Sequence, residues 1–207
     1  MIKQLVLKDI VLQRKLGFAY LICLFFLAIV DFHSDSFLMT FIMFIPVLGM
    51  MLSMSYENRN KSEMIINSLP FNRTDIVIAK YIFVSILVTL GGFFSLVISL
   101  IQLQNENTTA FMLWGEILGG ITGGLVYSII VLPIEFSVGY SSAKQIAPFI
   151  GIAFGYLSGL IVSKVWLDVE NIWSTSLVVN ICFVAVLLLL YIISMLLSIH
   201  LYSERDL

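Results

Sequence analysis

The sequence predicts an all-α membrane protein with six transmembrane helices and both termini in the cytoplasm. Hydrophobic residues make up 60% of its 207 residues and charged residues only 12%, and the mean hydropathy is +1.04. A soluble domain has about 25% charged residues, so this composition excludes a soluble globular protein. The apolar residues gather in six runs that approach or reach the roughly 20 residues of a bilayer-crossing helix.

The predicted spans are joined by short polar connections along the whole chain. Residues 1–15 mix apolar and basic side chains, which favours a short cytoplasmic helix on the inner membrane surface over an irregular tail. The first and fifth spans are the shortest, and loss of either would reverse the orientation of everything that follows. Pro46 is expected to kink the second span, since proline removes a backbone donor. We place the spans at about residues 16–31, 37–56, 81–103, 117–138, 146–162 and 173–199.

The placement of basic residues indicates the orientation. With the N-terminus inside, the outer segments hold only Lys164, and the two cytoplasmic loops cover residues 57–80 and 139–145. Such an excess of basic residues on one side is the mark of cytoplasmic segments. Ten of the eleven basic residues then lie inside: Lys3, Lys8, Arg14, Lys15, Arg59, Lys61, Arg73, Lys80, Lys144 and Arg205.

The first cytoplasmic loop carries signals of a rigid structure. Asn60 can cap a short helix over KSEMIINSL, and Pro70 ends that helix because proline lacks an amide hydrogen. Asn72 can cap a second helix, with Asp75 three residues later, that continues into the third span. The pattern predicts a helix, a corner and a re-entry into the membrane.

Two roles fit this loop from its residues alone. Arg73 and Lys80 suit contact with lipid phosphates at the membrane surface. Met64, Ile65 and Leu69 suit the apolar cleft of a cytoplasmic partner, or equally the bilayer interface. The residues favour neither role over the other.

The predicted spans also contain acidic residues and glycines. Glu135 lies near the inner end of the fourth span and Glu116 near its outer end. Ionisable residues in spans are functional candidates, but both lie close enough to the headgroups that a solvated interfacial position is favoured over a substrate or proton site. Gly123 and Gly124 belong to the run GGITGG, which allows close helix approach. Packing within one subunit is favoured over a dimer seam or a substrate path.

No catalytic, metal-binding or cofactor-binding pattern is found in the sequence. It has no His-Glu-x-x-His motif and no paired acids within a span, and His33 and His200 fall on opposite sides of the membrane. It also lacks a Gly-x-x-x-x-Gly-Lys-Ser/Thr phosphate loop. An intramembrane enzyme is therefore disfavoured, and a transporter, a passive channel or a membrane anchor remains.

Two segments resemble the ABC-2 type permeases, which are the membrane subunits of ATP-binding-cassette transporters. The run NSLPFNRTDIVIAKY, residues 67–81, resembles the family's first cytoplasmic loop. The run LPIEFSVGYSSAK, residues 132–144, resembles a second conserved segment, although Glu135 and Ser137 depart from its usual pattern. The likeness is strongest to small six-span permeases of Gram-positive bacteria, similar to the membrane subunits of phenol-soluble-modulin exporters.

The resemblance implies a coupling helix in the first cytoplasmic loop, docked in a groove of a separate ATPase subunit. ATP and magnesium would bind that partner, and no nucleic acid would be involved. A second copy or a sister permease would complete an exporter of amphipathic peptides in the bacterial plasma membrane. A passive channel or membrane anchor without an ATPase remains the alternative. The residues implied in coupling are Glu63, Met64, Ile65, Ser68, Leu69, Pro70, Arg73, Gly139, Tyr140 and Lys144.

Overall fold

The computed structural model of the chain describes residues 2–14, 37–60, 72–102, 110–139, 141–153 and 177–205. Within these ranges every residue is helical except Asn60, Asn72, Gly139 and Arg205 at the ends of segments. The all-α prediction is therefore confirmed for the described residues. The predicted first span and most of the first cytoplasmic loop lie outside them.

Four long helices and two shorter ones make up the described structure. The long helices are α2 (Phe37–Arg59), α4 (Arg73–Gln102), α5 (Ala110–Val138) and α7 (Leu177–Glu204). The shorter helices cover residues 2–14 and 141–153. Three segments of the described helices are long and apolar enough to cross a membrane: Arg73–Val97, Ile117–Val138 and Ile181–Glu204.

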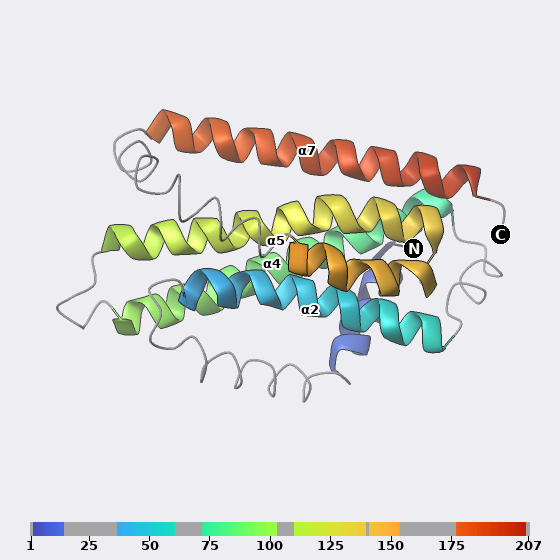
Figure 1. The fold of residues 1–207 in the computed structure, drawn as a ribbon, viewed down its shortest axis with the longest axis horizontal. Coiled ribbons are helices and arrows are strands. Elements are labelled where there is room, and N and C mark those ends of the chain that lie inside the picture. The colour runs from blue at the N-terminus through green and yellow to red at the C-terminus, as the bar shows by residue number, and fades with distance from the viewer. Residues whose placement is uncertain are drawn as a thin grey trace.

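The long helices lie side by side in a bundle, with α5 at its centre (Figure 1). α5 contacts α2, α4 and α7, and α4 contacts α2 and α7. One end of the bundle gathers the ends of α2, α5 and α7 and the start of α4, on the right of Figure 1. We call it the loop end, because both predicted cytoplasmic loops would lie there.

Helix 2–14 crosses the bundle instead of running along it (Figure 1). Leu5 is 6% exposed and belongs to the core, with Ile2 and Val6 packed against it. The opposite side carries exposed Leu7 and Val11. Both sides of this helix are thus partly apolar, in keeping with the mixture of apolar and basic side chains in its sequence.

α4 begins at Arg73 and continues without a break into the membrane-crossing segment. The carbonyl of Asn72 accepts hydrogen bonds from the amides of Asp75 (3.0 Å) and Ile76 (3.3 Å). The helix has 30 residues, or about 45 Å at 1.5 Å per residue. The capping pattern at Asn72 therefore marks the true start of one rigid helix.

α2 packs closely on α5 through glycine. A Cβ atom at Gly124 would lie 2.8 Å from Cγ of Pro46, and one at Gly123 would lie 3.1 Å from the sulfur of Met43. Any larger side chain at Gly124 would push α2 away, because proline cannot change rotamer to make room. The prediction that these glycines pack within one subunit is confirmed.

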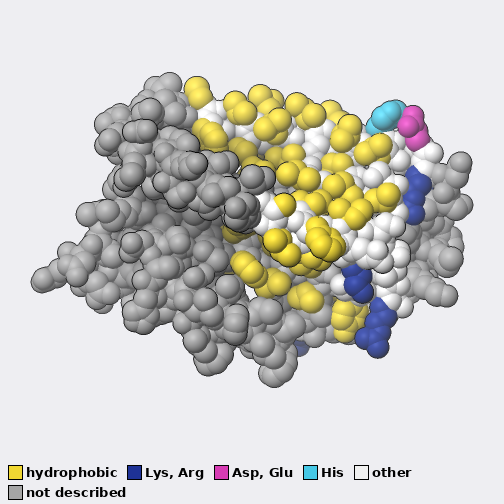
Figure 2. Space-filling view, in the orientation of Figure 1, with side chains coloured by type: hydrophobic (Ala, Val, Ile, Leu, Met, Phe, Trp, Pro, Cys, Tyr) yellow, Lys and Arg dark blue, Asp and Glu magenta, His cyan; other side chains and the backbone are white. Residues whose placement is uncertain are grey.

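The outer surface of the bundle is apolar. Figure 2 shows hydrophobic side chains over the described face, with the charged side chains mostly at the loop end. α7 is the most exposed of the three membrane-crossing segments, with 22% of its apolar window buried against 61% for α4. A surface of this kind suits a bilayer, where apolar side chains face lipid.

Candidate functional site

A buried ion pair joins the two ends of the predicted first cytoplasmic loop. Glu57 lies in the last turns of α2 and Lys80 in the first turns of α4, so the loop begins shortly after one and ends shortly before the other. Lys80 Nζ donates to Glu57 Oε2 at 2.6 Å, and the two residues are 3% and 2% exposed. The two helix ends that flank the loop are therefore held together inside the protein.

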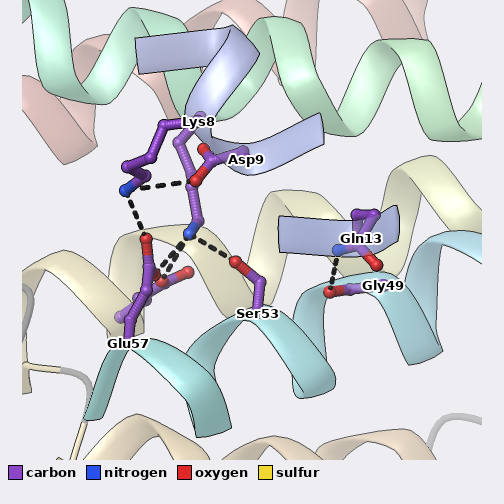
Figure 3. Close-up of polar contacts among 8 residues, drawn as sticks. Lys8, Asp9, Gln13, Gly49, Ser53 and Glu57 are labelled. Atoms are coloured by element: carbon purple, nitrogen blue, oxygen red, sulfur yellow. Dashed lines mark hydrogen bonds and ion pairs between the residues drawn. The ribbon is translucent and has the colours of Figure 1, made fainter. Parts of the chain in front are cut away.

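Two further helices bring charge to this pair (Figure 3). Lys80 Nζ also donates to Ser53 Oγ at 3.0 Å and lies 3.6 Å from Glu135 Oε1 of α5. From helix 2–14, Lys8 Nζ donates to Glu57 Oε1 at 2.8 Å and lies 3.1 Å from Asp9 Oδ1. We call the five ionisable residues the charge cluster: Lys8, Asp9, Glu57, Lys80 and Glu135.

Helix 2–14 is attached to α2 at a second point as well. Gln13 Nε2 donates to the carbonyl of Gly49 at 3.0 Å (Figure 3). Together with Lys8 and Leu5, this contact fixes the helix across the bundle.

Asp9 lies outside the membrane-crossing segments, and its burial controls the pKa of its carboxyl. Asp9 is 3% exposed. Burial raises the pKa of its carboxyl above the ordinary value, because the fields of Lys80 and Lys8 do not fully offset the loss of hydration and Glu57 repels it. Asp9 thus pays a desolvation cost when helix 2–14 docks.

Two expectations from the sequence are wrong at this site. Lys80 does not reach lipid phosphates, because its ammonium is buried against Glu57. Glu135 is not solvated at the interface, because it is 1% exposed. The reason is the central position of α5, whose end is enclosed by α2, α4 and helix 2–14.

Beside the charge cluster, Arg73 holds the C-terminal end of α7. Its Nη1 atom lies within hydrogen-bonding distance of the carbonyls of Tyr202 (2.9 Å), Ser203 (3.0 Å) and Arg205 (2.8 Å). The last carbonyls of a helix lack partners within the helix and carry partial negative charge, so a guanidinium satisfies them. The start of α4 is thereby fastened to the end of α7.

Gly139 meets the same end of α7 from the second predicted loop. It follows α5 with a φ of +83°, a conformation that glycine adopts without the cost of a Cβ atom. The guanidinium of Arg205 occupies the space that a Cβ would need. Arg73 and Gly139, predicted from separate loops, therefore converge on the last turn of α7.

Hydroxyl groups continue the contact between α4 and α7 into the bundle. The Tyr81 hydroxyl pairs with Ser194 Oγ at 2.8 Å and Ser198 Oγ at 2.9 Å. One turn further, the Tyr191 hydroxyl donates to the Tyr81 carbonyl at 2.8 Å and lies 3.2 Å from Ser85 Oγ. Hydrogen bonds therefore hold the exposed α7 against α4 at several levels.

The remaining predicted site residues divide into two groups. Lys144 lies exposed on helix 141–153, and Glu116 belongs to α5 at the end opposite Glu135. The others lie outside the described residues: Glu63, Met64, Ile65, Ser68, Leu69, Pro70 and Tyr140. The structure thus brings together Arg73 and Gly139 through α7, and joins Glu135 to the base of the first loop.

Sequence reasoning did not single out Lys8, Asp9 or Glu57 as site residues. A usable signal was present for Glu57, because Glu57 and Lys80 have opposite charges at the facing ends of consecutive predicted spans. Consecutive antiparallel helices commonly pack together, so such a pair is a candidate contact. For Lys8 and Asp9 no comparable signal exists, since their position depends on how helix 2–14 crosses the bundle.

The comparisons with known proteins agree with the resemblance seen in the two sequence segments. A model of the ABC-2 family transporter proteins matches residues 4–203. No curated protein matches the chain, and no solved structure matches it. Since the match covers nearly the whole chain, the protein belongs to the ABC-2 transporter family.

Proposed function

We propose that this protein is the membrane-spanning permease subunit of an ATP-binding-cassette exporter whose ATP is hydrolysed by a separate subunit. Membership of the ABC-2 family supports a permease. The observation that carries the coupling role is the buried Glu57–Lys80 pair at the base of the first cytoplasmic loop. A loop tied at both ends can pass a displacement to the bundle, whereas a slack loop would absorb it.

The path of such a displacement follows from α4. A force on the loop acts on Arg73 at the start of a continuous 30-residue helix. Arg73 is bonded to the end of α7 and Lys80 to α2. Motion of the loop would therefore move α4 together with its neighbours instead of bending one connection.

In this proposal the ATPase contacts the loop itself and the second cytoplasmic connection. Arg73 and Gly139 have a positioning part, because both contact the end of α7. The exported substrate is an amphipathic peptide, and a second permease copy or a sister permease completes the path across the bacterial plasma membrane. The residues offered to the ATPase are Glu63, Met64, Ile65, Ser68, Leu69, Pro70, Tyr140 and Lys144.

The test is purification of the tagged protein from native membranes in mild detergent, with mass spectrometry and ATPase assays of the complex. A variant with Glu63→Ala and Leu69→Ala should lose a co-purifying ATP-binding-cassette subunit and the associated hydrolysis. Lys164→Ala, in a predicted outer segment, is the matched control and should keep both. Arg73 is unsuitable for this purpose, since its loss would also loosen α7.

The alternative is a passive channel or a membrane anchor. The channel or anchor would be favoured if no ATPase co-purifies with the wild-type protein, either from native membranes or from chemically cross-linked cells. Retention of the ATPase by the loop variant would keep the permease function but place the docking surface elsewhere.

A further inference from the structure

The charge cluster contains one more negative group than positive. Its carboxyls belong to Asp9, Glu57 and Glu135, and its ammonium groups to Lys8 and Lys80. Both glutamates and Lys80 are at most 3% exposed. An unbalanced charge in such a place is costly, because water cannot solvate it.

The hydrogen bonds indicate which carboxyl of the charge cluster lacks a positive partner. Glu57 accepts from both lysines, one at each oxygen, at 2.8 and 2.6 Å. In the part of the chain that the structure describes, neither oxygen of Glu135 has a hydrogen-bond partner. Its ion pair with Lys80 spans 3.6 Å, which is longer than a hydrogen bond. Among the described residues, Asp9 Oδ1 also has no hydrogen-bond partner, but it lies 3.1 Å from Lys8 Nζ. Glu57 is therefore satisfied as a carboxylate and Asp9 keeps a close cation, whereas Glu135 has only the longer contact with Lys80.

The groups around Glu135 act on it in opposite directions. Lys80 of α4 lies 3.6 Å from Glu135 and also pairs with Glu57 of α2, while Asp9 of helix 2–14 pairs with Lys8 beside Glu57. A nearby ammonium favours a carboxylate, whereas nearby carboxylates favour the neutral acid. On α5 itself, the Tyr127 hydroxyl donates to the Ala147 carbonyl at 3.3 Å, toward helix 141–153.

The α7 side of this region presents hydroxyls. Tyr81 of α4 is engaged by Ser194 and Ser198 of α7. Lys80 therefore forms ion pairs with Glu57 and Glu135, and the third buried carboxyl, Asp9, pairs with Lys8.

Two cationic ligands could restore the balance, a metal ion or a proton. A metal ion needs several oxygen ligands converging on one point. Among the described residues, no group of three His, Cys, Asp or Glu side chains is placed to hold one. A proton needs only one carboxyl oxygen.

We propose that the charge cluster is a proton-binding site and that Glu135 holds the proton while helix 2–14 is docked. A proton from solvent joins the carboxylate and yields the neutral acid, so two carboxylates then face two ammonium groups. Lys80 remains committed to Glu57, and the cluster has no net charge. Departure of helix 2–14 would remove Asp9 and Lys8 and admit water, which provides the route for proton exchange.

The experiment is infrared spectroscopy of the purified full chain in lipid nanodiscs at neutral pH. The carbonyl stretch of a protonated carboxylic acid is separate from that of a carboxylate and shifts in heavy water. We expect this band in the wild type, its loss in Glu135→Gln, and its retention in Glu116→Gln, the matched acid at the other end of α5. Its absence from the wild type, or its persistence in Glu135→Gln, would overturn the proposal.

A second comparison covers the case in which Glu135→Gln does not fold. Wild-type protein is then labelled with carbon-13 at the side-chain carboxyls of glutamate or, separately, of aspartate. The band must shift with labelled glutamate and stay in place with labelled aspartate. A shift with labelled aspartate would assign the proton to an aspartate such as Asp9 and refute the assignment to Glu135. None of these measurements involves an ATPase, so their outcome is independent of the proposed function.

Discussion

Replacement of Lys80 by methionine tests the buried ion pair most directly. Methionine is similar in length but has no charge, so it fills the space and removes the ammonium. Glu57 would lose its 2.6 Å partner and Glu135 its 3.6 Å partner, while Ser53 would lose a donor. Removing one member of a buried pair costs about 3–5 kcal/mol, so we expect Lys80→Met to lower the free energy of unfolding by about that amount.

The assay is reversible unfolding of the purified protein in mixed micelles, followed by circular dichroism. A second variant, Lys80→Met with Glu57→Gln, removes the stranded charge as well and should recover a substantial part of the loss. Lys3→Met is the control, because Lys3 is exposed on helix 2–14 and surface substitutions change stability by only about 0.5 kcal/mol. If Lys80→Met behaves like Lys3→Met, the pair does not stabilise the loop base and our reasoning on coupling fails.

Three further predictions concern the helix contacts and the acid of helix 2–14. Gly124→Leu should destabilise the protein by about 1–3 kcal/mol, as measured by thermal unfolding, because a Cβ would lie 2.8 Å from Pro46; an unchanged midpoint would contradict the α2–α5 packing. Gly139→Ala should cost about 1–3 kcal/mol, because of its φ of +83°, and limited proteolysis should show earlier cleavage near the end of α7; cleavage as in the wild type would argue against that contact. The raised pKa of Asp9 means that the folded protein binds its proton more tightly than the unfolded chain, so stability falls as pH rises from the ordinary value of 3.8 through the folded one. The asparagine of Asp9→Asn cannot ionise, so the stability of this variant relative to the wild type should rise over that pH interval. A stability difference that does not change with pH would refute the raised pKa of Asp9.

Local features of the fold could be predicted from the sequence because they depend on neighbouring residues. The start of α4 after Asn72 follows from capping and from the apolar run that begins soon after it. The packing role of Gly123 and Gly124 follows from their spacing and from the lack of a side chain. Both signals involve residues within a few turns of one helix.

The charge cluster could not be predicted in the same way, because its members come from four separate helices. The position of Glu135 near the end of a span is readable from sequence, but its enclosure depends on α2, α4 and helix 2–14. The same holds for Lys80, whose aliphatic stem and ammonium would suit a lipid phosphate if α2 did not present Glu57. Arg73 was predicted as a site residue, but its contact with the α7 carbonyls depends on a segment 129 to 132 residues later.

The hydroxyl and guanidinium contacts between α4 and α7 have a consequence for how the chain is assembled. α7 is synthesised after α4 and α5, so Tyr81 enters the membrane region, and Arg73 reaches its edge, before the groups that satisfy them exist. Polar groups without partners are costly in lipid, and α4 must therefore be kept near water, lipid headgroups or an insertion factor until Ser194, Ser198 and residues 202–205 arrive. A nascent chain that ends before α7 would therefore keep these polar groups of α4 without their partners, and membrane quality control can act on such exposed polarity.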